Sequence, residues 1–134
     1  PGSPQALAKD PTPYEWVRMR EQWYKAFEDL FQQLMAHREE LRRELSIGIT
    51  HQEANRLESG AYDAANMAGI RDEYNRLYAN LHSPLVIIPD SYDAFWVRRL
   101  QERLEVGKAE LRRATELMDQ EFQFAMDLKR KVKR

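Results

Sequence analysis

The sequence predicts an all-α fold, an antiparallel up-down-up bundle of three helices in which the third helix is the longest. After position 4, prolines occur only at 11, 13, 84 and 89, which leaves 70 proline-free residues between Pro13 and Pro84 and 45 after Pro89. Because proline breaks helix interiors, these two stretches are where long helices can form. Apolar residues recur at helical spacing through both stretches, and two capping motifs mark helix starts.

The first predicted helix covers residues 13–46. Thr12 and Glu15 form a capping box around Pro13, which stands at the favoured first helical position. Apolar residues follow in adjacent pairs, such as Trp23 with Tyr24, and a face this wide must contact two neighbours. Gly48 offers the C-terminal cap that ends this helix.

The second predicted helix covers residues 50–82 and starts at a second capping-box pattern, in residues 50–53. Its first half carries small residues, which let a neighbouring backbone come close: Gly60, Ala61, Ala64, Ala65, Ala68 and Gly69. A glycine inside a helix lowers the stability of the helix by about 1 kcal/mol relative to alanine. A kink or break at Ser59 and Gly60 is therefore left open.

A linker over residues 83–90, bracketed by Pro84 and Pro89, separates this helix from the third. We expect its apolar centre, residues 85–88, to cover one end of the bundle. The third predicted helix covers residues 91–132, with Asp90 or Ser91 as the cap. Its apolar residues keep a 3-4 spacing, with weak places at Gly107 and Glu121. No stop signal precedes the end of the sequence, which leads us to expect that a parent chain continues.

If neighbouring helices are antiparallel and have the same rise per residue, the position of each turn determines which residues lie opposite one another. Folding about Gly48 places Trp23 opposite Tyr74 and Phe31 opposite residues 64–67. Folding the second helix onto the third places Gly107 opposite the alanines at 64 and 65. In this register the third helix extends past its neighbours by roughly ten residues, about 15 Å. An alternative is that Gly48 straightens and that the first two helices exchange between two chains.

The composition fits one domain over residues 12–134 within the 134-residue chain, preceded by a tag remnant or disordered lead over residues 1–11. Apolar residues make up 43% and the net charge is −1, which excludes a disordered chain. The sequence has no cysteine, which excludes disulfides and weakly favours a cytoplasmic or nuclear location. No apolar run approaches the roughly 20 residues of a membrane span.

Nothing in the sequence indicates catalysis or a cofactor. It contains no phosphate-loop, dinucleotide-binding, zinc-protease or nucleophile-elbow motif. His37, His51 and His82 fall near helix ends or on polar sides, and in the predicted bundle they do not converge on one metal ion. We therefore expect a protein that is not an enzyme and that binds no metal.

The predicted overhang carries the candidate binding residues. Phe124, Leu128 and Val132 form an apolar strip, followed by a basic segment of Lys129, Arg130, Lys131, Lys133 and Arg134. These five account for 5 of the 21 basic residues, so that residues 1–128 hold 16 basic against 22 acidic residues, a charge of −6. The pattern favours a non-catalytic interaction or scaffold module that docks a partner helix, or its own copy as a homodimer, near the end of the third helix.

Two alternatives use the same segment. The basic residues could bind acidic polymers, either nucleic acid or acidic protein tails, although the acidic body and the lack of interleaved aromatics argue against nucleic acid. The segment could also lie on a membrane surface. In architecture alone the outline resembles spectrin-type repeats and other three-helix adaptor bundles, a likeness that does not define function.

Overall fold

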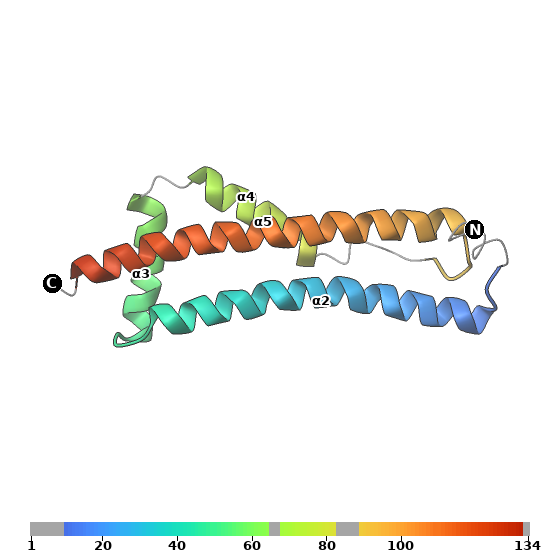
Figure 1. The fold of residues 1–134 in the computed structure, drawn as a ribbon, viewed down its shortest axis with the longest axis horizontal. Helices are drawn as coiled ribbons and strands as arrows, with labels where there is room; N and C mark the ends of the chain where they lie inside the picture. Colours follow the sequence, from blue (N-terminus) through green and yellow to red (C-terminus); the bar gives the residue numbers. More distant parts are fainter. Residues whose placement is uncertain (1–9, 65–67, 83–88, 133–134) are drawn as a thin grey trace.

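The computed structural model is all-helical, and it describes residues 10–64, 68–82 and 89–132, among which there is no strand. In this part of the chain four helices pack together: α2 (Pro13–Leu45), α3 (His51–Ala64), α4 (Ala68–His82) and α5 (Ala94–Val132). Figure 1 shows α2 and α5 as two long rods lying side by side. The shorter α3 crosses both rods at one end, and α4 lies along α5.

The long helices run in the same direction, as an up-down-up path requires of the first and third members. Leu30 of α2 lies against Gly107 of α5, and further along both helices His37 pairs with Asp119 at 2.7 Å. The α4 helix runs the opposite way. Glu73, near the start of α4, bonds to Arg113 of α5. Asn80, near the end of α4, bonds to Glu110, which comes earlier in α5.

The second predicted helix is the main difference from the sequence-based expectation. The range 50–82 contains both α3 and α4, which take different directions (Figure 1), and so the three-helix detail is not confirmed. Residues 65–67 lie outside the described residues. No break falls at Ser59 and Gly60, because α3 continues through them to Ala64. A methyl group on Gly60 would lie 3.7 Å from Leu128 Cδ1, at ordinary van der Waals distance, so α3 and α5 pack against each other at this position.

The predicted helix starts are confirmed at α2 and α3. The Thr12 hydroxyl accepts from the Glu15 backbone N–H at 3.2 Å, and the Glu15 carboxylate accepts from the Thr12 N–H at 3.0 Å. The Thr50 hydroxyl accepts from the Glu53 backbone N–H at 3.1 Å. Between these helices Gly48 has φ +77°, a left-handed conformation that favours glycine, and this lets the chain reverse.

The start of α5 is corrected to Ala94, and its cap is Asp93 rather than Asp90 or Ser91. The Asp93 carboxylate accepts from the Phe95 backbone N–H at 2.9 Å. Asp90 instead pairs with Arg20 of α2 at 2.6 Å. Beside it, the Trp16 indole N–H donates to the Pro89 carbonyl at 2.9 Å, which ties the segment before α5 to the start of α2. The predicted position of residues 85–88 falls outside the described residues.

Three apolar clusters follow one another along the α2–α5 pair. At the start of the pair, Trp16, Val97 and Leu100 are buried together. In the middle, leucines of α2, α4 and α5 form the largest cluster, which includes Leu34 and Leu117. At the far end, Leu45, Ala54, Ala61 and Ala125 join α2, α3 and α5.

The predicted pair of Trp23 and Tyr74 is wrong, because it depended on an unbroken second helix. Trp23 packs in the first cluster, whereas Tyr74 packs in the middle one. The Phe31 ring meets Tyr78 edge-on at 5.4 Å between ring centroids, and residues 65–67 of its predicted partner range lie outside the described residues. Gly107 accommodates Leu30 of α2, and the side chains of its predicted partners at 64 and 65 lie outside the described part of the structure.

Candidate functional site

The apolar strip predicted near the end of α5 is divided in the structure. Phe124 is 43% exposed and Val132 is 75% exposed. Leu128, between them, is half-buried and packs against the far-end cluster beneath Gly60. The crossing of α3 therefore covers part of the predicted overhang, and the last turn of α5 projects past it (Figure 1).

Lys129 is a correction to the predicted exposed basic segment, because it is buried, at 8% exposure. Its ammonium group donates to the Leu45 carbonyl at 2.8 Å and to the Ile47 carbonyl at 2.6 Å. The last carbonyls of a helix lack partners within the helix and carry its negative dipole end. Lys129 therefore caps the C-terminal end of α2 and forms no part of an exposed docking surface.

The remaining basic residues divide between described and undescribed positions. Arg130 and Lys131 are exposed, and Arg130 pairs with Asp127 of its own helix at 2.9 Å. Lys133 and Arg134 lie outside the described residues. We call Phe124, Arg130, Lys131 and Val132 the α5 tip, since these four predicted site residues are exposed within the last nine residues of α5.

A second candidate site lies where all four helices meet, and we call it the four-helix cleft. Its cavity volume is about 210 Å³. Its apolar lining comes from Leu41, Leu45, Met118, Phe122 and Ala125, with the rings of Tyr74 and Tyr78. Its charged and amide-bearing lining consists of Arg38, Arg42, Glu58, Arg71, Asn75 and Glu121.

The charges of the cleft are unequal. Three arginines and two glutamates line it, which gives one net positive charge. Arg42 is engaged with α3, since it pairs with Glu58 at 3.0 Å and donates to the Asn55 amide oxygen. Both side chains of the Arg42–Glu58 pair are about one quarter exposed, at 24% and 23%. This ion pair fixes the wall of the cleft that α2 and α3 share.

Tyr74 is the most unusual group of the cleft. Its hydroxyl oxygen is buried and has no hydrogen-bond partner among the described residues. Burial raises the pKa of Tyr74, opposed by the nearby positive charge of Arg38, while the charges of Tyr78, Glu121 and Glu58 raise it further. All four of these neighbours line the cleft, which places the buried hydroxyl close to its wall. A buried hydroxyl without a partner costs about 1–3 kcal/mol.

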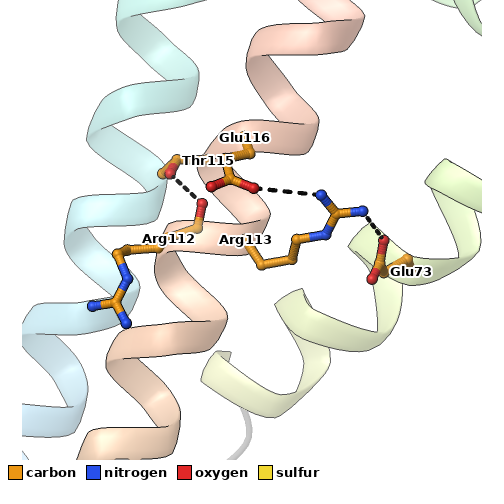
Figure 2. Close-up of polar contacts among 5 residues, drawn as sticks. All are labelled: Glu73, Arg112, Arg113, Thr115 and Glu116. Atoms are coloured by element: carbon orange, nitrogen blue, oxygen red, sulfur yellow. Dashed lines mark hydrogen bonds and ion pairs between the residues drawn. The ribbon is translucent and has the colours of Figure 1, made fainter.

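Outside the cleft, a polar network holds α4 against α5 (Figure 2). Arg113 of α5 donates to Glu73 of α4 at 2.8 Å and to Glu116 at 3.4 Å. The bond from Arg113 lowers the pKa of the Glu73 carboxyl, and the same bond raises the pKa of Arg113. The Thr115 hydroxyl donates to the Arg112 carbonyl one turn earlier. This exposed network joins helices and forms no cavity wall.

His37 and His51 have separate surroundings, and the side chain of His82 lies outside the described residues. His37 pairs with Asp119, and His51 is exposed at the start of α3. Within residues 10–64, 68–82 and 89–132, no group of three or more histidines and carboxylates is placed to hold a metal ion. In the same residues, no helix combines the length and the apolar character needed to cross a bilayer.

Comparison with known proteins gave no match, whether against protein-family models, curated proteins or solved structures.

Sequence reasoning missed the four-helix cleft. Arg38 and Arg42 are spaced i,i+4 beside the apolar face of α2, and Tyr74 belongs to the buried face of the second predicted helix. That spacing was the available signal. It did not suffice because the cleft forms only when α3 and α4 take separate directions, so that one long helix has two different neighbours along its length.

Proposed function

We propose that this chain is a non-catalytic protein-interaction module that docks a partner helix, or a second copy of itself, at the α5 tip. The observation that supports this proposal is the exposure of two large apolar residues of α5, Val132 at 75% in its last turn and Phe124 at 43% eight residues earlier. Single exposed apolar residues are ordinary, whereas exposed apolar residues grouped on one helix beside basic ones are a candidate interface.

The two kinds of tip residue have different roles in the proposed mechanism. Burial of Phe124 and Val132 provides affinity, since each apolar Å² removed from water contributes about 25 cal/mol. Arg130 and Lys131 steer an acidic partner surface toward the tip and raise the association rate. A helix that presents apolar residues flanked by acidic ones has the matching chemistry.

The experiment is affinity capture with the intact chain and with a Phe124→Glu/Val132→Glu variant. Deleting residues 122–134 is unsuitable, because it removes Ala125 and Lys129 from the folded core. Val106→Glu is the matched control, since Val106 is 57% exposed on the same helix. We expect the tip variant to lose partners that the intact chain and the control both retain. Equal capture by all three proteins would refute the tip as the docking surface.

Sedimentation equilibrium distinguishes the two versions of the proposal. If the occupant is a second copy, the mass of the intact chain rises toward a dimer with concentration, and that of the tip variant stays monomeric. If the occupant is another protein, both chains remain monomers while capture still differs. A dimer that is unchanged in the tip variant would place self-association elsewhere.

Binding of acidic polymers is the second candidate, favoured by the exposure of Arg130 and Lys131 at the end of α5. With Lys129 buried, fewer cations face solvent than the sequence alone suggests. Binding of poly-glutamate that falls steeply with salt and is lost in an Arg130→Gln/Lys131→Gln variant would support this candidate. Binding that does not depend on salt would exclude it.

A further inference from the structure

We propose that the four-helix cleft binds a carboxylate carried on a small apolar body. This inference is independent of the α5 tip, because neither Phe124 nor Val132 lines the cleft. The site is formed by side chains from α2, α3, α4 and α5, so that a ligand there would contact every described helix.

The size and lining of the cleft set the size of the ligand. A cavity of about 150 Å³ is sufficient for a benzene ring. The 210 Å³ of this cleft leaves additional space for a short chain that ends in a polar group. Leu41, Met118 and Phe122 supply an apolar surface on which such a ring would lie.

The charge of the cleft selects an anion of low charge. Arg42 is already paired with Glu58, so this arginine and this glutamate offset one another. Arg38 and Arg71, both exposed, and Glu121 also line the cleft, and its charged lining residues together carry one net positive charge. A single carboxylate neutralises that charge, whereas a phosphate dianion would leave an excess negative charge beside the glutamates.

Tyr74 supplies a hydrogen bond that the protein itself does not use. Its buried hydroxyl has no acceptor among the described residues, although polar groups in protein interiors nearly always have partners. Because the pKa of this hydroxyl is raised, chiefly by burial, it stays protonated and can donate. A carboxylate oxygen held between Tyr74 and the Arg38 guanidinium would accept from both.

The experiment is calorimetric titration of the full chain with 3-phenylpropionate. The neutral isostere 3-phenylpropanamide and inorganic phosphate serve as comparison ligands. We expect the carboxylate to bind at least tenfold more tightly than either of them. Equal affinity for the amide would show apolar binding without anion recognition, and equal affinity for phosphate would show a general anion site. Either result would overturn the proposal.

Variants locate the binding within the cleft. Arg38→Gln should weaken 3-phenylpropionate about tenfold, and Tyr74→Phe, which retains the ring, about threefold. Arg112→Gln is the matched control, because Arg112 is an exposed arginine of α5 outside the cleft. Helicity and the melting temperature establish that each variant is folded. Unchanged affinity in both cleft variants, or an equal loss in the control, would overturn the assignment.

A further pair of ligands distinguishes a free small molecule from the end of a partner chain. One is a five-residue peptide that ends in phenylalanine with a free carboxylate, and the other is the same peptide with a terminal amide. Tighter binding of the acid peptide than of 3-phenylpropionate supports a chain terminus as the source, and the reverse supports a small molecule. The Phe124→Glu/Val132→Glu variant should bind 3-phenylpropionate and the acid peptide with the affinity of the intact chain. Failure of the tip proposal and failure of the cleft proposal can therefore be told apart.

Discussion

Replacing Lys129 by methionine tests the most unexpected contact of this structure. The substitution retains a buried apolar stem and removes the two hydrogen bonds to the Leu45 and Ile47 carbonyls. Hydrogen bonds to a charged group contribute about 1.5–3 kcal/mol each. Relief of the burial of the ammonium charge offsets part of this loss. We therefore expect the free energy of unfolding to fall by about 2–3 kcal/mol.

This loss is measurable in two ways. Unfolding entropies near 2.1 cal/mol/K per residue imply a decrease in melting temperature of roughly 9 °C for a chain of this size. Urea unfolding should show a lower midpoint with an unchanged slope. In addition, hydrogen exchange should become faster at the Ser46 and Ile49 backbone amides, whose bonds to Arg42 and Ser46 carbonyls close the end of α2.

Lys131→Met is the matched control, because Lys131 is exposed on the same helix two residues later. An exposed lysine without a burial role should change the unfolding free energy by no more than about 0.5 kcal/mol. Equal effects of the two substitutions would refute the interpretation of Lys129 as a cap of α2. The basic segment would then be a uniformly solvated helix end, as the sequence alone suggests.

Three further predictions concern the helix contacts. Gly107→Ala should destabilise the fold by about 1 kcal/mol in urea unfolding, because the new methyl would lie 2.8 Å from Leu30 Cδ1. This loss should exceed the gain from the better helix propensity of alanine. A stabilised variant would show that this contact has room to relax. Trp16→Phe should cost about 2 kcal/mol in thermal unfolding, through loss of the indole hydrogen bond and of buried area, and an unchanged melting temperature would contradict the proposed tie to the segment before α5. The bond to Arg113 lowers the pKa of Glu73 in the folded state, so the stability that this group contributes is present above pH 4.5 and is lost as pH falls through the lower folded pKa. The urea midpoint of Glu73→Gln should therefore fall less between pH 6 and pH 3 than that of the unmodified chain. Parallel curves of midpoint against pH for the two proteins would contradict this.

The predictable part of the fold was the part encoded by local signals. The capping box at Thr12 and Glu15 defines the start of α2, and Gly48 reverses the chain with a left-handed φ of +77°. The 3-4 spacing of apolar residues carries α5 to Val132 as expected. Each of these features depends on residues within one or two helical turns, and the sequence contains them directly.

The parts that were predicted wrongly depend on long-range packing. The small residues Gly60 and Ala61 were correctly expected to admit a close neighbour, but the neighbour is α5, which α3 crosses. Nothing local distinguishes a long antiparallel helix from two shorter helices in different directions. The burial of Lys129 has the same origin, because only the relative placement of α2 and α5 brings its ammonium group to the Leu45 carbonyl.

The candidate sites show the same division. Phe124 and Val132 are exposed on one helix, and the sequence analysis included both in its candidate strip together with Leu128, which is half-buried. The four-helix cleft requires Arg38 of α2, Tyr74 of α4 and Glu58 of α3 to meet, and this depends on three separate helix directions. A site made by a junction of helices leaves no short motif in the sequence.

The proposed docking function is tested most directly by site-specific photo-crosslinking. Benzoylphenylalanine placed at position 124 reports contacts of the α5 tip, and the same group at position 106 reports another exposed position of α5, since Phe124 and Val106 are both exposed. We predict a discrete adduct at position 124, either a dimer or one partner band, that is absent at position 106 and is suppressed by Val132→Glu. Equal adducts at the two positions, or none at position 124 where capture succeeds, would contradict the account.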